Sequence, residues 1–191
     1  MLTDLIVSRV RVKLLEIFLY KPQEIYYVRQ LVREIDEEIN AVRRELLRME
    51  KFGMVKKEVR GNRLYYGFNS EYVLYADLLS LINKSVGLGG QIIRLKNKLG
   101  RIRFAVMSGR FIRHLPTKEG RVDLLLVGEI ALPELAKIIR EEEVKIGKEI
   151  NYSVMTKDEF DFRKKRRDPF LNSILSNSRI MLLGDEEELT A

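Results

Sequence analysis

Apolar residues recur every three or four positions through most of the first 50 residues, which is the spacing of amphipathic helices. The pattern predicts helices over residues 4–20 and 26–35, and a third helix that begins after Asp36. Lys21-Pro22 ends the first helix, because the residue before a proline disfavours helical backbone. Asp36 is a candidate N-cap, and the third helix is expected to bury Ile39, Val42, Leu46 and Met49.

After Gly53 the pattern becomes that of two short strands separated by Gly61-Asn62, a dipeptide that suits a tight hairpin turn. The inward side of this hairpin is expected to carry Val55, Val59, Leu64, Tyr66 and Phe68. Two helices joined by a short link and followed by a hairpin are typical of a winged helix-turn-helix. In such a unit the last helix enters the major groove of DNA.

A further apolar-periodic helix is predicted over residues 71–85, and the glycine run 87–90 is expected to break it and mark a domain boundary. Beyond residue 90, helical and strand patterns alternate, which predicts a small sheet with helices packed against it. The predicted strands cover residues 103–107, 122–127, 149–155 and 180–183. The predicted helices cover residues 91–99, 132–146, 157–166 and 170–175.

These elements predict a mixed α+β fold with two domains. The winged helix-turn-helix is expected over residues 1–70 and a small α/β domain over residues 90–185, followed by an acidic, frayed tail at 186–191. Residues 71–89 are expected to form a connector that pairs with its copy in a homodimer, which would place two recognition helices one DNA turn apart. The alternative is that this helix packs against the first helix of its own chain.

Composition narrows the classes of function. The chain has 191 residues, of which 46% are hydrophobic, so we expect a proper core. The net charge of +7 favours an anionic partner. The lack of cysteine excludes disulfides and thiolate metal sites, and the single histidine, His114, argues against a histidine metal centre or a Ser-His catalytic unit. No cofactor is expected.

No apolar run approaches the roughly 20 residues of a membrane span, and the N-terminus has no signal-peptide pattern. A soluble, cytoplasmic protein without membrane contact is therefore expected. Basic residues are concentrated in two stretches: residues 84–121 contain ten of them against one acid, Glu119, and residues 163–167 read RKKRR. These stretches could extend a contact with nucleic acid, or they could be solubilising faces.

The strings VRRELLRMEKFGMV at residues 42–55 and RGNRLYY at residues 60–66 resemble the recognition helix and wing of winged-helix transcriptional regulators. This resemblance implies binding to double-stranded DNA through Asn40, Arg43, Arg44, Arg48, Arg60, Asn62 and Arg63. Asn40 and Arg44 suit the edges of adenine and guanine, whereas the other arginines suit phosphates. The alternatives are a merely solvated arginine-rich face and a winged helix that binds only protein.

Residues 90–184 resemble the minimal nucleotidyltransferase domain, which has a DNA-polymerase-β-like fold. The resemblance rests on MSGR at 107–110, VDLLLVG at 122–128, EINYSV at 149–154, DEF at 158–160, DPFL at 168–171 and IMLLG at 180–184. Active members hold a nucleotide with Gly-Ser and two metal ions with paired aspartates. Here those positions read Ser108-Gly109 and Arg121-Val122-Asp123, and Asn151 replaces the third carboxylate. The resemblance therefore implies an inactive relative without catalytic residues or a metal site.

A phosphate could still bind without metal at this position, because an arginine supplies positive charge. The candidate phosphate or nucleotide site comprises Ser108, Gly109, Arg110, Arg121 and Asp123. The alternative is that Arg121 and Asp123 form a surface ion pair. We expect a dimeric transcriptional regulator whose second domain is a sensor, with a nucleotide as candidate effector, or an assembly module. Other readings are an active nucleotidyltransferase that modifies protein or RNA, and an antitoxin-like interaction module.

Overall fold

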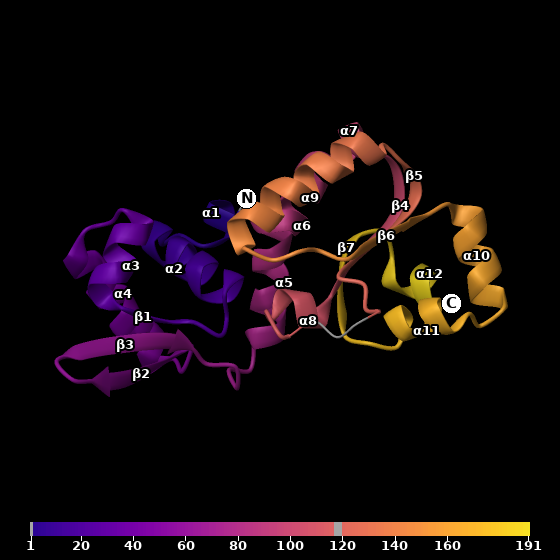
Figure 1. Ribbon diagram of the computed structural model, residues 1–191. Coiled ribbons are helices and arrows are strands. Elements are labelled where there is room, and N and C mark those ends of the chain that lie inside the picture. The colour runs from indigo at the N-terminus through magenta and orange to yellow at the C-terminus, as the bar shows by residue number, and fades with distance from the viewer. Residues whose placement is uncertain (1, 117–119) are drawn as a thin grey trace. The chain divides into compact units, whose positions relative to one another are not determined.

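The computed structural model of the chain describes residues 2–116 and 120–191 and shows a mixed α+β protein (Figure 1). The chain divides into two compact units, Met1–Ser85 and Val86–Ala191. Each unit has its own β-sheet, and the two sheets contain three and four strands.

The first unit combines helices with a three-stranded antiparallel sheet of order β1-β3-β2. Its elements are α1 (Leu2–Leu5), α2 (Arg9–Tyr20), β1 (Ile25–Tyr27), α3 (Val28–Ile35), α4 (Ile39–Lys51), β2 (Val55–Arg60), β3 (Arg63–Phe68) and α5 (Tyr75–Ser85). The predicted helix over residues 4–20 is thus interrupted. Ser8 begins the longer part as an N-cap, since its hydroxyl accepts a hydrogen bond from the Arg11 amide at 3.2 Å.

The link between α3 and α4 differs from the prediction in the residue that caps the N-terminus of α4. Asp36 ends α3 in a left-handed conformation with φ 48°, which aspartate tolerates better than most residues. Glu38 is the N-cap of α4 instead, because its carboxylate accepts from the backbone amides of Asn40 and Ala41 at 2.8 and 2.9 Å. The prediction of Asp36 as N-cap was therefore wrong by two residues.

The core of the first unit forms where the helices and the sheet meet. Its fully buried side chains include Leu14, Leu15 and Phe18 of α2, Leu31 of α3, Leu46 and Met49 of α4, and Leu79 and Ile82 of α5. Helix α5 packs against α2 of the same chain. This is the intrachain packing that was considered as the alternative to pairing between subunits.

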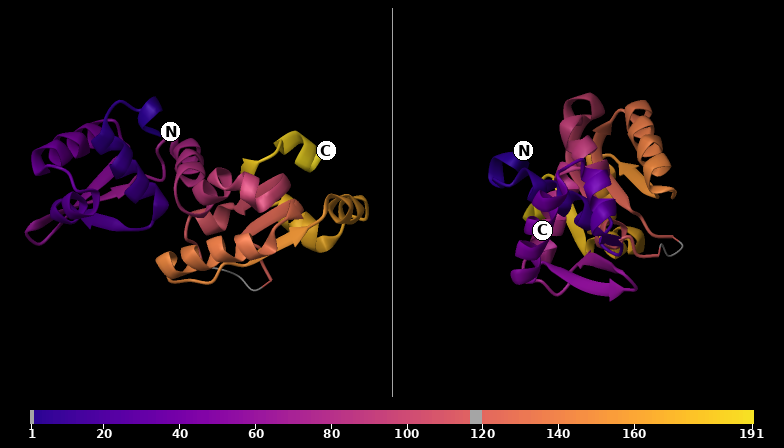
Figure 2. Two further views of the ribbon diagram at one scale, coloured as in Figure 1. Left: turned by 90° about the horizontal axis from the view of Figure 1, so that it is seen from above. Right: turned by 90° about the vertical axis from the view of Figure 1, so that its left-hand side faces the viewer.

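The β2–β3 hairpin has the expected turn, with Gly61 in the left-handed region at φ 56°. Val55, Tyr66 and Phe68 are buried as predicted. Val59 and Leu64 face each other across the two strands beside the turn, and they are 69% and 43% exposed. Their predicted burial was wrong, because the turn end of the hairpin extends past the helices of this unit (Figure 2).

The second unit has a four-stranded sheet of order β6-β5-β4-β7, in which only the β5–β6 pairing is parallel. Its strands are β4 (Gly100–Ser108), β5 (Leu124–Ile130), β6 (Tyr152–Met155) and β7 (Arg179–Leu183). Its helices are α6 (Gly87–Arg94), α7 (Lys96–Leu99), α8 (Gly109–Ile112), α9 (Leu132–Ile146), α10 (Lys157–Lys165), α11 (Pro169–Leu175) and α12 (Glu186–Thr190). Helix α5 ends at Ser85, as expected, and the glycine run 87–90 forms the start of a separate helix, α6.

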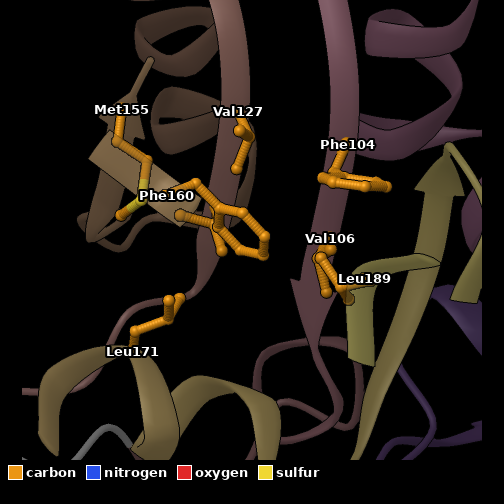
Figure 3. Close-up of a cluster of buried hydrophobic side chains, with 8 residues drawn as sticks. Phe104, Val106, Val127, Met155, Phe160, Leu171 and Leu189 are labelled. Carbon is orange, nitrogen blue, oxygen red and sulfur yellow. The ribbon is translucent and has the colours of Figure 1, made fainter. Parts of the chain in front are cut away.

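Both faces of the second sheet are covered by helices, with α6 and α9 on one side and α10 to α12 on the other (Figure 1). Eight buried apolar residues form a cluster on the α10–α12 side: Phe104, Val106, Leu125, Val127, Met155, Phe160, Leu171 and Leu189 (Figure 3). Burial on two faces explains why the VDLLLV run lacks alternation.

The C-terminal acidic residues form a helix rather than the expected frayed tail. Asp185 is the N-cap of α12, and its carboxylate accepts from the Glu188 amide at 3.0 Å. The acidic first turn suits the positive end of the helix dipole. Leu189 is fully buried in the cluster of Figure 3, so tertiary packing orders the segment.

Candidate nucleic-acid interface

Helix α4 has a buried apolar side and an exposed side that carries positive charge. Val42, Leu46 and Met49 are buried, while the predicted DNA-contacting residues Asn40, Arg43, Arg44 and Arg48 are all exposed. None of the three arginines has a hydrogen bond or an ion pair with the described residues. The structure therefore leaves these three guanidinium groups available to an external anion.

The acidic residues beside α4 are held by partners within the unit. Glu37 contacts Lys13 at 2.6 Å and Arg9 at 3.0 Å, and the hydrogen bond from Lys13 is the main reason that the pKa of Glu37 is lowered. Glu38 caps the helix, and the bonds from the Asn40 and Ala41 amides lower its pKa. Both carboxylates are therefore engaged by groups within the unit.

Two other carboxylates on α4 connect this helix to its neighbours. Glu45 accepts from the Ser8 hydroxyl at 3.1 Å and from the Arg11 guanidinium at 2.5 Å, which links α4 to the start of α2. Glu50 pairs with Lys57 of β2 at 2.7 Å. These contacts fix how α4 is oriented within its unit and keep its negative charges on the inner side.

The hairpin turn presents Arg60, Asn62 and Arg63, all exposed. Arg60 is already paired, since its guanidinium donates to both carboxylate oxygens of Glu58 at 2.8 and 3.0 Å. Arg63 instead lies over the ring of Tyr27, with 4.9 Å between the guanidinium carbon and the ring centroid. The two hairpin arginines are therefore not equivalent: Arg60 is paired with Glu58, whereas Arg63 has no carboxylate partner among the residues that the structure describes.

A groove of about 820 Å³ lies between α3, α4 and the hairpin. It contains two of the predicted arginines and the predicted turn asparagine, and it also contains apolar side chains. The residues lining it are Tyr27, Val28, Arg29, Arg33, Arg43, Leu46, Leu47, Val59, Asn62, Arg63, Leu64 and Tyr66. Sequence reasoning missed Tyr27 and Arg33. Tyr27 joins the site through the pairing of β1 with β3, and Arg33 of α3 donates a hydrogen bond to the Tyr27 hydroxyl.

The second unit contains a smaller cavity of about 170 Å³ at the end of β4. Of the predicted phosphate-site residues, only Ser108 and Arg121 line it; the other lining residues are Val106, Val122, Leu125, Ser173, Ile174, Asn177, Ser178 and Arg179. Gly109 is buried nearby, but its amide donates to the Ser178 carbonyl at 2.7 Å. Arg110 donates to the Pro116 carbonyl at 2.9 Å.

Asp123 lies apart from this cavity. It is 4% exposed, and its carboxylate accepts from the Asn151 amide at 3.1 Å. Burial raises its pKa. The ion pair of Asp123 with Arg121 that the sequence allowed is not formed: the carboxylate is held by the Asn151 amide instead.

Arg179 is a cavity residue that sequence reasoning missed. It lies opposite Ser108 in the β4–β7 pairing. Its place in the cavity could therefore be predicted only with the register of these two strands. Its guanidinium donates to the Leu175 carbonyl and pairs with Glu186, while its Nε is buried without a hydrogen-bond partner among the described residues. The cavity thus contains two guanidinium groups and several hydroxyl and amide groups, a set that suits a phosphate.

Within residues 2–116 and 120–191, no group of three or more His, Asp or Glu side chains is arranged to hold a metal ion. None of the helices formed by these residues is long and apolar enough to cross a membrane. Comparison of the chain with protein-family models, with curated proteins and with solved structures found no match.

Proposed function

We propose that this protein is a DNA-binding transcriptional regulator whose first unit is a winged helix-turn-helix. In this proposal α3 and α4 are the helix-turn-helix, and the β2–β3 hairpin is the wing. The observation that carries it is the contrast on α4. Among the described residues, its three exposed arginines make no hydrogen bond or ion pair with a carboxylate, while the neighbouring carboxylates are engaged by partners within the unit. Such a surface favours a polyanion.

The roles of the side chains follow from their positions. An α-helix fits the major groove, so Asn40 and Arg44 on the outer side of α4 would meet base edges. Arg43, Arg48 and Arg63 would neutralise phosphates and fix the register. Arg60 would contribute less, because Glu58 already offsets its charge.

The second unit is proposed to be an inactive nucleotidyltransferase-like domain that acts as a sensor or in assembly. Support comes from Arg121 and from Asn151, which offer a cation and an amide where paired carboxylates would hold metal ions. Dimerisation also remains a proposal, in which the exposed Val73 and Leu74 before α5 would supply apolar contact area.

Binding of the full chain to duplex DNA from its own promoter region, titrated with salt, tests the DNA-binding function. We expect the Arg43→Ala/Arg44→Ala and Arg60→Ala/Arg63→Ala variants to bind about tenfold more weakly or worse, since each loses a base or phosphate contact worth about 1–3 kcal/mol. Lys137→Ala/Arg140→Ala is the matched control: it removes two exposed cations of α9. Unchanged affinity in both test variants would contradict the proposal.

Binding of a nucleotide effector is a second candidate function. The observation that favours it is the cavity lined by Arg121 and Arg179. Calorimetric titration of the protein with ATP and with inorganic phosphate measures this binding, and Arg121→Ala is expected to abolish it. A nucleotide-transfer assay with Mg²⁺ or Mn²⁺ tests the competing enzymatic reading. Metal-dependent transfer that is lost in Asp123→Ala would overturn the assignment as an inactive domain.

A further inference from the structure

One line of side chains runs along the outer surface of α4. Asn40, Arg44, Leu47 and Lys51 follow one another at intervals of four, three and four residues, so they project from the same side of the helix. This side is opposite the buried Val42, Leu46 and Met49. Leu47 is the large apolar residue on the line, and it is 58% exposed.

Leu47 is not an isolated exposed leucine, which would need no explanation. It lines the same groove as Val59 and Leu64, the exposed cross-strand pair of the hairpin. Three solvent-exposed apolar side chains, from α4, β2 and β3, therefore converge on one groove, and Arg43 and Arg63 line it with them. Convergence of this kind marks an interaction surface.

The charge of the groove indicates the class of partner, and its apolar wall indicates what is recognised. Arginines without carboxylate partners complement a polyanion such as duplex DNA. The major groove offers one strongly apolar group to a protein, the C5-methyl group of thymine. We propose that Leu47 contacts this methyl group, so that the site bound by α4 contains an A·T pair near the middle of the helix. The inference rests on the proposed DNA-binding function and names the base that the helix selects.

The spacing along α4 sharpens this inference. Asn40 and Leu47 are seven residues apart, which corresponds to about 10 Å of helix. That length matches about three base pairs of B-DNA if the helix lies along the groove. Asn40 suits adenine, so the preferred site would contain an adenine and a thymine separated by about three base pairs.

Uracil substitution tests the role of Leu47, because uracil differs from thymine only in lacking the methyl group. Bound duplexes are first selected from a random library with the full-length protein, and each thymine of the selected site is then replaced by uracil. At one position the wild-type protein should lose about fourfold in affinity, the equivalent of about 0.8 kcal/mol for one buried methyl group. In Leu47→Ala the same replacement should have no effect on affinity. In a double-mutant cycle, this loss of the uracil penalty is the result expected for a direct contact between Leu47 and the methyl group.

Leu132→Ala is the matched control, since Leu132 is a helical leucine of the second unit with 56% exposure. This variant should show the full wild-type response to uracil. A uniform tolerance of uracil by the wild-type protein, or an unchanged uracil penalty in Leu47→Ala, overturns the inference while leaving DNA binding intact. Failure of the library to yield any bound sequence overturns the proposed function together with this inference.

Discussion

The environment of Asp123 links pH to the stability of the fold. It is buried beside the Asn151 amide, and its pKa is raised above the ordinary value of 3.8 chiefly by loss of hydration. The folded protein therefore binds this proton more tightly than the unfolded chain does. The stabilisation is complete below pH 3.8 and is lost as the pH rises through the folded-state pKa.

Replacing Asp123 with asparagine should remove this dependence. We expect Asp123→Asn to unfold at a higher denaturant concentration than the wild type at pH 7, because the asparagine oxygen still accepts from Asn151 without a buried charge. The advantage should shrink as the pH is lowered towards 4. Urea titrations at several pH values measure it, with the exposed Asp77→Asn in α5 as control. Equal shifts in both variants would contradict this explanation.

Residue identity alone could not distinguish Arg60 from Arg63. Both flank the turn and both suit phosphate, so the sequence assigned them one role. The structure separates them through Glu58, which binds only Arg60, and Tyr27, which stacks on Arg63. Likewise Arg179 could not be placed beside Ser108 before the β4–β7 register was known.

At the scale of elements, the parts of the fold that depend on local pattern were predictable. Helix α9 has the predicted bounds, Leu132–Ile146, since its periodicity ends at Gly147 in a left-handed conformation. Strand β1 was missed because its three residues are a strand only through pairing with β3. The exposure of Val59 and the burial of Leu189 depend in the same way on which elements lie nearby.

Helix α12 provides a test of whether packing against neighbouring elements orders a short segment. Leu189→Ala should lower the free energy of unfolding by about 2–5 kcal/mol, the usual cost of removing a fully buried leucine. Glu187→Ala, in the same helix but exposed, should change it little. Denaturant unfolding followed by circular dichroism measures both variants. A small effect of Leu189→Ala would indicate that the helix is dispensable.

At the scale of the whole molecule, the proposed DNA binding together with a net charge of +7 predicts that salt is the main control of affinity. If Arg43, Arg48 and Arg63 each neutralise one phosphate, the logarithm of the binding constant should fall against the logarithm of salt concentration with a slope of about −3 per protomer. Additional contacts from residues 94–103 or 163–167 would make the slope steeper.

Comparison of the two turn arginines gives this slope a residue-level control. Arg63→Ala should flatten it by about one unit, as expected for one lost phosphate contact. Arg60→Ala should flatten it less, because the charge of Arg60 is offset by Glu58. Anisotropy titrations between low and moderate salt provide the measurement, and equal slopes for the two variants would argue against the assigned difference.

Tyr27 has a consequence for the free energy with which an anion would bind in the groove. Its hydroxyl accepts from Arg33 at 2.8 Å, Arg63 lies over its ring, and Tyr65 meets its ring edge-on at a centroid distance of 5.9 Å. Long cationic side chains normally lose conformational entropy when a ligand orders them. Here the tyrosine orders two of them in the unbound protein. If an anion binds in the groove as proposed, part of this entropic cost is already met in the unbound protein.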